Sequence, residues 1–204
     1  MKTEELAGIQ DAGERMIPTK EGEISFVFSR HEFAYRYAQN FVHHKTVIDI
    51  GCGTGYGCKL LAEKAKFVIG IDYDAEAIHY CRTHYSSHNI QYIQLDASSL
   101  TMVDRQFDVA ISFQVIEHLQ EVNNFMTSLK EIVTPNGIIM LSTPNAKKKA
   151  KKKNPFHVHE MSYDQFRELL EAHFESFDLL GVAYARNNKL RSFLGKTPFY
   201  QWGK

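Results

Sequence analysis

The feature that most constrains the fold of this chain is an apolar run followed by alternating glycines, TVIDIGCGTGYG, at residues 46–57. Gly51, Gly53 and Gly55 come directly after a run rich in β-branched residues and directly before a stretch of helical composition. Because glycine has no Cβ, the backbone at such positions turns sharply and comes close to a ligand. The pattern therefore predicts a strand, a nucleotide-type binding loop and a helix that begins at the loop.

The spacing of these glycines distinguishes between two kinds of ligand. A dinucleotide-binding loop needs glycine at its first, third and sixth positions, but the sixth residue is Tyr56 when counted from Gly51 and Cys58 when counted from Gly53. Asp49, at the end of the strand, would repel a phosphate but could bind the ammonium group of a methionine moiety, directly or through water. These residues disfavour a pyrophosphate site.

Short apolar runs alternate with stretches of helical period along the middle of the chain, which is typical of βαβ units in a parallel sheet. We expect strands at residues 46–50, 67–71, 90–95, 107–112, 138–142 and 177–184. Helices are predicted to begin at the caps Asp74 and Ser162, and another spans residues 122–133 before a Thr-Pro-Asn-Gly turn. The predicted fold class is α/β, a doubly wound, mostly parallel Rossmann-like sheet with helices on both faces.

Acidic residues follow the second and third predicted strands. The carboxylate of Asp72 can accept hydrogen bonds from both ribose hydroxyls of an adenosine. Asp96 can accept from the adenine amino group while the backbone amide of Ala97 serves a ring nitrogen, and Tyr73 offers the adenine a flat surface. These residues are candidates for adenosine recognition.

Composition excludes some classes of protein. Lysine and arginine together (24) balance aspartate and glutamate (24), so no global field draws the chain to nucleic acid or to an anionic membrane. Three cysteines without metal-type spacing predict free thiols. The acidic N-terminus and the lack of an apolar run of about 20 residues lead us to expect a cytoplasmic protein. The lysine-rich run at residues 147–153 is interpreted as a solvated loop.

Five segments, VIDIGCGTGYG, GIDYD, LDAS, FDVAISFQVIEHL and TPNGIIMLSTPN, stand in an order and spacing that resemble those of class I S-adenosylmethionine-dependent methyltransferases, over residues 12–183. The resemblance implies S-adenosyl-L-methionine as cofactor and S-adenosyl-L-homocysteine as product. It assigns Cys52 and the glycines to the cofactor loop, and Phe113 and Gln114 to the methionine end of the cofactor.

The resemblance also implies a domain organisation. Residues 1–44, including a predicted helix at residues 31–42, are expected to form an N-terminal helical lid or substrate segment, in which Arg15, Tyr35 and Tyr37 are candidates. Residues 45–204 are expected to form the methyltransferase domain. Members of this class end with an antiparallel seventh strand; no clear strand pattern follows residue 184, so six strands are the alternative.

Histidines after the fourth predicted strand carry the expected chemistry. A sulfonium methyl is already activated, so the protein needs to align the acceptor, exclude water and remove a proton. His118 and His157 are the candidate catalytic bases, with His159 nearby. In some ubiquinone-pathway and small-RNA methyltransferases a Glu-x-x-Glu-His set and a later histidine hold a divalent metal, a pattern that Glu117, His118 and His157 resemble. Gln114 replaces the first carboxylate, so a metal is left open and no metal ligand is assigned.

The predicted function is methyl transfer to oxygen or nitrogen of a small-molecule acceptor, with a sugar or secondary metabolite preferred. Two alternatives remain. One is 2′-O-methylation of RNA 3′ ends, favoured by the histidine segments and the lysine run but disfavoured by Gln114 and the neutral charge, and the other is a non-catalytic partner subunit that binds the cofactor. The chain is expected to be a monomer or homodimer without a membrane partner.

Overall fold

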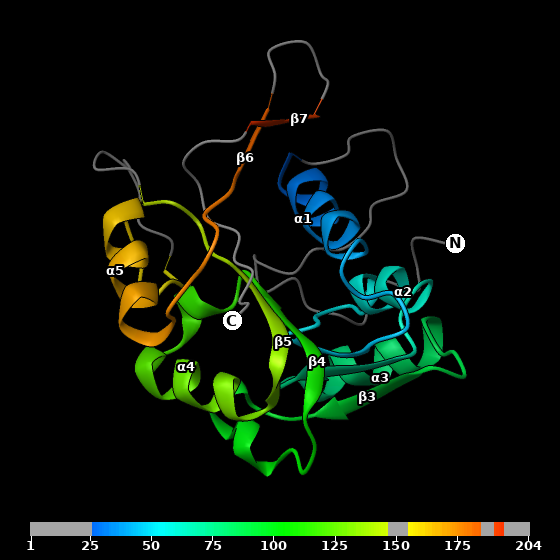
Figure 1. Cartoon of the computed structure of the whole chain (residues 1–204). Coiled ribbons are helices and arrows are strands. Elements are labelled where there is room, and N and C mark those ends of the chain that lie inside the picture. Colours follow the sequence, from blue (N-terminus) through cyan, green and yellow to red (C-terminus); the bar gives the residue numbers. More distant parts are fainter. Residues whose placement is uncertain (1–25, 147–154, 185–189, 194–204) are drawn as a thin grey trace. The chain divides into compact units, whose positions relative to one another are not determined.

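The computed structural model of the protein describes residues 26–146, 155–184 and 190–193 (Figure 1). The chain divides into two compact units, residues 1–97 and 98–204. Five parallel strands form the main sheet in the order β3-β2-β1-β4-β5. The α/β fold class predicted from the sequence is therefore confirmed, with five strands in the main sheet. None of the helices in the described part of the chain is long and apolar enough to cross a membrane.

The first unit is built from a helix, two βα repeats and a third strand. Its elements are α1 (Phe26–Ala38), β1 (Thr46–Ile50), α2 (Tyr56–Ala62), β2 (Phe67–Asp72), α3 (Ala75–His84) and β3 (Ile90–Gln94). Strand β1 pairs in parallel with β2, and β2 pairs with β3. The three predicted strands agree with the observed ones to within one residue. Nearly all side chains of β1 and β2 are buried, as expected of parallel strands covered on both faces.

Two helix starts follow from local hydrogen bonding. The side chain of Asp74 accepts from the backbone N–H groups of Glu76 and Ala77, so α3 begins at the predicted cap. In the second unit, α5 (Tyr163–His173) begins with the predicted capping box, in which Ser162 and Gln165 bond reciprocally to each other's backbone N–H. The N-terminal helix was predicted at residues 31–42, whereas α1 begins and ends earlier, at Phe26–Ala38.

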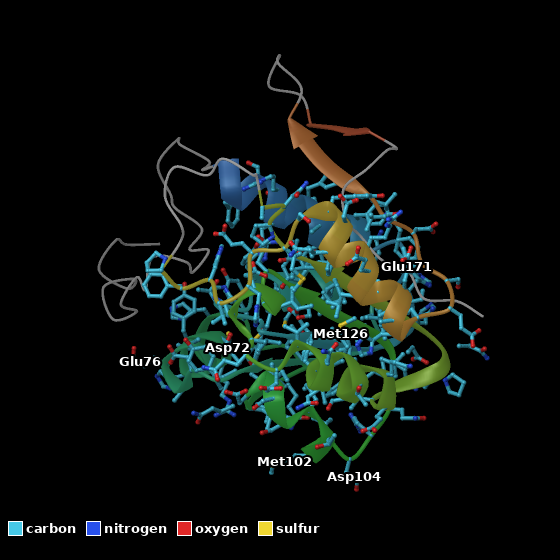
Figure 2. The ribbon with its side chains drawn as sticks, turned by 90° about the vertical axis from the view of Figure 1, so that its left-hand side faces the viewer. Asp72, Glu76, Met102, Asp104, Met126 and Glu171 are labelled. Atoms are coloured by element: carbon cyan, nitrogen blue, oxygen red, sulfur yellow. The ribbon has the colours of Figure 1, made fainter. Side chains whose placement is uncertain are left out.

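The second unit contributes the other two strands of the sheet. It contains the short helix η2 (Ala97–Met102), which begins in the first unit, and β4 (Phe107–Phe113), η3 (Ile116–His118), α4 (Val122–Glu131) and β5 (Val133–Ser142) before α5. Helix α4 buries Phe125, Met126 and Leu129 on one face. Figure 2 labels Met126, which is buried, and also Met102, which is 75% exposed.

Strand β5 is longer than predicted, because the expected Thr-Pro-Asn-Gly turn lies inside it. The register runs from Phe107 opposite Val133 directly to Val109 opposite Ile138, so residues 134–137 bulge out opposite one residue of β4. A Cβ on Gly137 would lie 2.3 Å from a side-chain carbon of Val133 and 3.0 Å from the backbone oxygen of Asp108. The turn residues therefore make a bulge within the strand instead of preceding it.

The predicted sixth strand is shorter and pairs elsewhere. Strand β6 (Gly181–Tyr184) pairs antiparallel with β7 (Leu190–Phe193) in a separate two-stranded sheet. The expectation that no strand follows residue 184 was therefore wrong, since β7 is such a strand. The segment around Arg15 and the lysine run at residues 147–153 lie outside the described residues. The division into a lid or substrate segment at residues 1–44 and a methyltransferase domain at residues 45–204 stays a prediction.

Candidate cofactor-binding and acceptor sites

The glycine loop between β1 and α2 has the conformation that its sequence demands. Gly51, Gly53 and Gly55 all have positive φ, at 72°, 53° and 80°. These values lie in the left-handed region, which side chains with a Cβ rarely adopt. The backbone N–H groups of Gly51 and Cys52 both donate to the carbonyl of Ile71, at 2.8 and 2.9 Å. The loop is thus held against the end of β2, and Gly55 caps the start of α2.

Asp49 is the second-last residue of β1, just before the loop, and its carboxylate is completely buried, with 0% of the residue exposed. The hydroxyl of Tyr35 donates to both of its oxygens at 3.1 Å, and the thiol of Cys58 donates to Oδ2 at 3.2 Å. Burial raises the pKa of Asp49 to about 7, the neighbouring Asp72 adds to the rise, and the hydrogen bonds from Cys58 and Tyr35 act in the opposite direction. Asp49 therefore changes charge near neutral pH.

Asp72 lies at the end of β2, and its carboxylate shapes the loop that it faces. Its Oδ2 accepts from the backbone N–H of Gly53 at 2.9 Å, and its Oδ1 accepts from that of Asp74 at 3.0 Å. A carboxylate has about four lone-pair positions, so its two oxygens can accept more hydrogen bonds than these two. Asp72 is almost completely buried, and these hydrogen bonds give it a structural role in holding the loop.

The remaining predicted adenosine residues lie along the chain after β2 and β3. Tyr73 has 68% of its surface exposed, which leaves its ring accessible to a flat ligand. Asp96 is exposed and Ala97 is half-buried at the start of η2. Their assignment to the adenine stays a prediction.

The three cysteines of the first unit are all buried and free, as predicted. The thiol of Cys81 donates to the backbone oxygen of Gly53 at 3.2 Å, beneath the loop. A hydrogen bond with Cys58, followed by burial, raises the pKa of Cys52. Burial raises the pKa of Cys58 to about 12, so its thiol stays protonated and remains a donor to Asp49.

In the second unit, the end of β4 carries an unusual backbone conformation. Gln114 has a φ of 59° although it is not glycine, and its side-chain nitrogen donates to Ser142 Oγ at 3.1 Å. Its backbone N–H donates to the carbonyl of Ser142 at 2.9 Å. Left-handed backbone at a residue with a Cβ costs energy and is concentrated at functional sites. Phe113, just before it, is buried.

Two segments that are distant in sequence meet after β4. The backbone oxygen of Glu117 accepts from the N–H groups of Val158 at 2.8 Å and His159 at 3.0 Å. The rings of His118 and His157 stand at 5.2 Å with an edge-to-face angle of 73°. One ligand atom each from Glu117, His118 and His157 lie within 4.8 Å of one another. The sequence pairing of the QVIEH and FHVHE segments is thus observed as a three-residue cluster.

The hydrogen bonds of this cluster define how each imidazole is oriented. Nδ1 of His118 lies 2.9 Å from the backbone oxygen of Phe156, and Nδ1 of His157 lies 3.1 Å from Glu160 Oε1. A carbonyl and a carboxylate accept protons, so each Nδ1 carries the hydrogen in the neutral ring and each Nε2 carries a lone pair. A partner of this kind on the second nitrogen is typical of metal-binding histidines.

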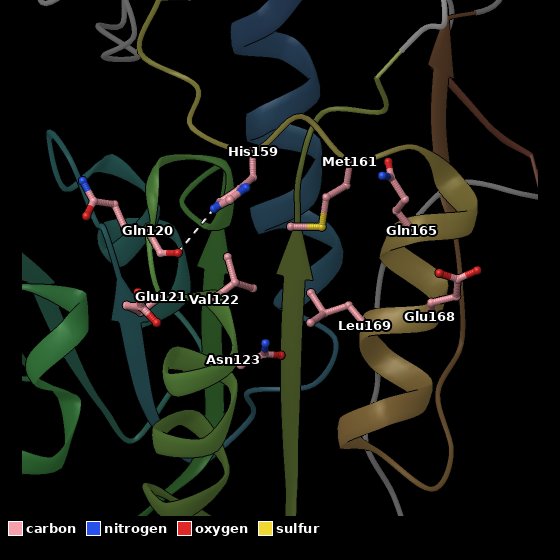
Figure 3. Close-up of a pocket in the computed structure, with 9 residues that line it drawn as sticks. All are labelled: Gln120, Glu121, Val122, Asn123, His159, Met161, Gln165, Glu168 and Leu169. Atoms are coloured by element: carbon pink, nitrogen blue, oxygen red, sulfur yellow. Dashed lines mark hydrogen bonds between the residues drawn. The ribbon is translucent and has the colours of Figure 1, made fainter.

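A pocket of about 400 Å³ lies in the second unit between the start of α4 and α5 (Figure 3). Its lining residues are Gln120, Glu121, Val122, Asn123, His159, Met161, Gln165, Glu168 and Leu169. His159 is held there by a contact of 3.3 Å between its Nε2 and the backbone oxygen of Gln120. The lining therefore combines a few apolar side chains with carboxylates and amides, and one of its residues, His159, lies two positions after His157 in the sequence.

For three residues of these sites, the sequence did not predict the contacts that the structure shows. Tyr35 was interpreted only as a lid candidate, and nothing pointed to Cys58 or Glu160. Each acts through a contact that joins different elements or segments, as in the hydrogen bonds to Asp49 and to His157. The one signal in the sequence is that a second cysteine and a tyrosine-rich helix flank the glycine loop.

A solved structure shares this fold. The N-methyltransferase NodS from Bradyrhizobium japonicum, in complex with S-adenosyl-L-homocysteine, has a TM-score of 0.66 and 15% sequence identity, over 86% of this chain and 87% of that chain. This likeness shows the fold. The parallel sheet and the glycine loop after its first strand define a Rossmann-like α/β protein.

Sequence comparison narrows the class to a family. A family model described as a methyltransferase domain matches residues 42–190. A protein of Mycolicibacterium smegmatis with the name "Probable S-adenosylmethionine-dependent methyltransferase" is 37% identical over 175 residues, 83% of this chain and 67% of that protein. A ubiquinone biosynthesis O-methyltransferase of Brucella ovis is 35% identical over 105 residues, 50% of this chain and 42% of that protein. The chain belongs to the S-adenosylmethionine-dependent methyltransferases, and it spans two thirds or less of the length of these relatives.

Proposed function

We propose that the protein transfers the methyl group of S-adenosyl-L-methionine to an oxygen or nitrogen atom of a small-molecule acceptor, with a sugar or secondary metabolite preferred. The observation that carries this proposal is the cluster of Glu117, His118 and His157 in the second unit. The similarity to a ubiquinone biosynthesis O-methyltransferase supports small-molecule O-methylation.

The first unit supplies the groups that we assign to the cofactor. Asp49 attracts the ammonium group of the methionine end, since an ionised buried carboxylate acts strongly through the low-dielectric interior. Asp72 accepts from the ribose hydroxyls, while Tyr73, Asp96 and Ala97 contact the adenine. In the second unit, Phe113 and Gln114 contribute to the methionine end.

The histidines are assigned to the acceptor. Methyl transfer to a hydroxyl or amine acceptor releases a proton, and the Nε2 lone pair of a neutral imidazole can take it as general base. Nε2 of His118 and Nε2 of His157 are the two such positions in the cluster. Glu160 favours the tautomer of His157 that carries the lone pair on Nε2.

The same three residues fit a divalent metal, because two imidazole nitrogens and one carboxylate oxygen converge within 4.8 Å. Glu117, His118 and His157 would hold the ion, and when bound it would act as a Lewis acid that lowers the pKa of an acceptor hydroxyl. With two nitrogen ligands and Gln114 in place of a carboxylate, the set suits Zn²⁺, Mn²⁺ or Ni²⁺ better than Mg²⁺.

A methyl-transfer screen tests the proposed function. Purified protein would be incubated with methyl-labelled cofactor and panels of sugars, phenols, amines and short RNAs. We expect transfer to a small molecule, with a rate that falls at least tenfold in His118→Ala while cofactor affinity is kept. His79→Ala, an exposed histidine of α3, is the matched control and should leave the rate unchanged. Transfer to RNA alone, or cofactor binding without any turnover, would overturn the proposal in favour of an RNA 2′-O-methyltransferase or a partner subunit.

Metal binding is tested separately from activity. Calorimetric titration with Zn²⁺ and Mn²⁺ should detect one site in the wild-type protein and none in His157→Ala. His159→Ala is the control, because Nε2 of His159 is held by the backbone oxygen of Gln120. Equal metal affinity in wild-type and His157→Ala protein would rule out this site and leave the histidines as acid–base groups.

A further inference from the structure

Helix α1 packs on the glycine-loop helix through Tyr35. A Cβ at Gly57 would lie 2.1 to 2.5 Å from three atoms of the Tyr35 ring, so the ring occupies the space that a side chain at residue 57 would need. Tyr35 itself is 1% exposed. From this position its hydroxyl reaches both oxygens of Asp49. The distance between α1 and the end of β1 is therefore determined by a contact that only glycine at residue 57 permits.

Further contacts fasten α1 to α2 along its length. The ring of Tyr56, the first residue of α2, lies 5.5 Å from Tyr35 and 5.1 Å from Phe28, and its hydroxyl bonds to His31 Nδ1. Near the other end, the side-chain amide of Gln39 donates to the backbone oxygen of Leu60 at 2.6 Å. Because Gly55 of the loop is the N-cap of α2, we expect a displacement of α1 to be transmitted to the loop and to Asp49.

The groups around Asp49 make the Tyr35 hydroxyl important for its charge. The ionisable groups that face it are the phenols of three tyrosines, the thiols of three cysteines and the carboxylate of Asp72, namely Tyr35, Tyr56, Tyr92, Cys52, Cys58, Cys81 and Asp72. All of these groups are neutral or negative, so none of them offers Asp49 a positive charge. Burial raises the pKa of Tyr35 well above its usual value, so its hydroxyl keeps its proton and donates. Hydrogen bonds from neutral donors are thus what favours the carboxylate form of Asp49.

We propose that Tyr35 is a positioning residue that orients the Asp49 carboxylate and thereby determines the affinity for the methionine end of the cofactor. The inference rests on the role proposed above for Asp49. It links the docking of α1 to cofactor affinity, because the same side chain makes both contacts. Removal of the hydroxyl leaves the ring packed on Gly57 but takes a donor from both carboxylate oxygens.

The consequence is specific for one part of the ligand. S-adenosyl-L-homocysteine carries the ammonium group, whereas 5′-methylthioadenosine has the same adenosine without it. Loss of a hydrogen bond to a charged group should weaken binding of the first ligand about tenfold at pH 7. Binding of the second ligand should not change. A general loss of structure would weaken both.

The test is calorimetric titration of both ligands into wild-type, Tyr35→Phe and Tyr37→Phe protein between pH 6 and 8.5. Tyr37 is the matched control, since it lies on the same helix with its ring 5.3 Å from that of Phe41. In the wild type, affinity for S-adenosyl-L-homocysteine should rise as Asp49 ionises near pH 7. In Tyr35→Phe this rise should move to higher pH, while 5′-methylthioadenosine binds as before and Tyr37→Phe behaves as the wild type.

Two results would overturn the inference: an unshifted pH profile in Tyr35→Phe, or an equal loss of affinity for both ligands. Asp49→Asn separates this failure from that of the proposed function. If Asp49→Asn weakens S-adenosyl-L-homocysteine binding and Tyr35→Phe does not, only the role of Tyr35 is wrong. If Asp49→Asn leaves the affinity unchanged, the cofactor role proposed for Asp49 is wrong.

Discussion

The buried carboxylate of Asp49 should make the ligand-free protein less stable as the pH rises. Its pKa is about 7 in the folded protein and 3.8 for a free side chain, so between these values the folded state holds a proton that the unfolded state has lost. Stability therefore falls as the pH rises from about 4 to about 7. Because one pKa unit corresponds to about 1.36 kcal/mol, the full cost above neutral pH is roughly 4 kcal/mol.

The substitution Asp49→Asn should relieve this cost. The amide is neutral at every pH, and its oxygen can still accept from Tyr35. At pH 8.5 we expect the variant to be more stable than the wild type by roughly 2 to 4 kcal/mol, which for a chain of this size is a rise in Tm of about 2 to 4 °C per kcal/mol. At pH 5 the gain should be less than half of that at pH 8.5, and it should vanish below about pH 4, where Asp49 is protonated in the unfolded chain as well.

Urea denaturation of both proteins without ligand at pH 5, 7 and 8.5 measures the difference in the free energy of unfolding. Asp104→Asn, at an exposed carboxylate labelled in Figure 2, is the control and should change nothing at any pH. A stability gain of the same size at pH 5 and pH 8.5, or no gain at pH 8.5, would refute the reasoning. The cofactor affinity of Asp49→Asn should fall, so stability and binding would move in opposite directions.

Three further substitutions probe packing, binding and capping. Gly57→Ala should lower the free energy of unfolding by about 1 to 3 kcal/mol, since its Cβ would meet the Tyr35 ring; an unchanged denaturation midpoint would contradict this contact. Asp72→Asn should weaken S-adenosyl-L-homocysteine binding about tenfold in calorimetry, and wild-type affinity would argue against its ribose role. Ser162→Ala should lower the free energy of unfolding by about 1 kcal/mol, because the side chain that caps α5 is lost; equal stability in thermal denaturation would contradict this role.

The elements predicted correctly are those determined by local patterns. Strand β1 has the predicted bounds, and Asp74 and Ser162 cap helices, because apolar runs and side-chain caps act within a few residues of sequence. The predictions failed where pairing between distant segments decides. The bulge at residues 134–137 depends on the register against β4, and β6 pairs with β7 and not with the main sheet.

The candidate sites divide in the same way. The glycine loop and Asp72 could be found from sequence, because strand ends and turn residues mark them. The meeting of His118 with His157 was expected only from resemblance, since 38 residues separate the histidine from the Phe156 backbone oxygen that it contacts. The partners of Asp49 escaped prediction, because side-chain contacts between α1 and β1 leave no periodic signal.

The hydrogen bonds at the ends of the segment from Ala146 to Met161 bear on how this enzyme can diversify. The backbone N–H of Ala146 donates to the oxygen of Met161 at 2.9 Å, while Glu117 anchors Val158 and His159. Loop-closure entropy grows slowly, by about 0.6 kcal/mol for each doubling in length. A change in the length of the chain between these anchors therefore adds little closure free energy as long as the hydrogen bonds of Ala146 and Glu117 are kept. Chain length before Phe156 can thus vary independently of the backbone contacts that join Glu117 to Val158 and His159.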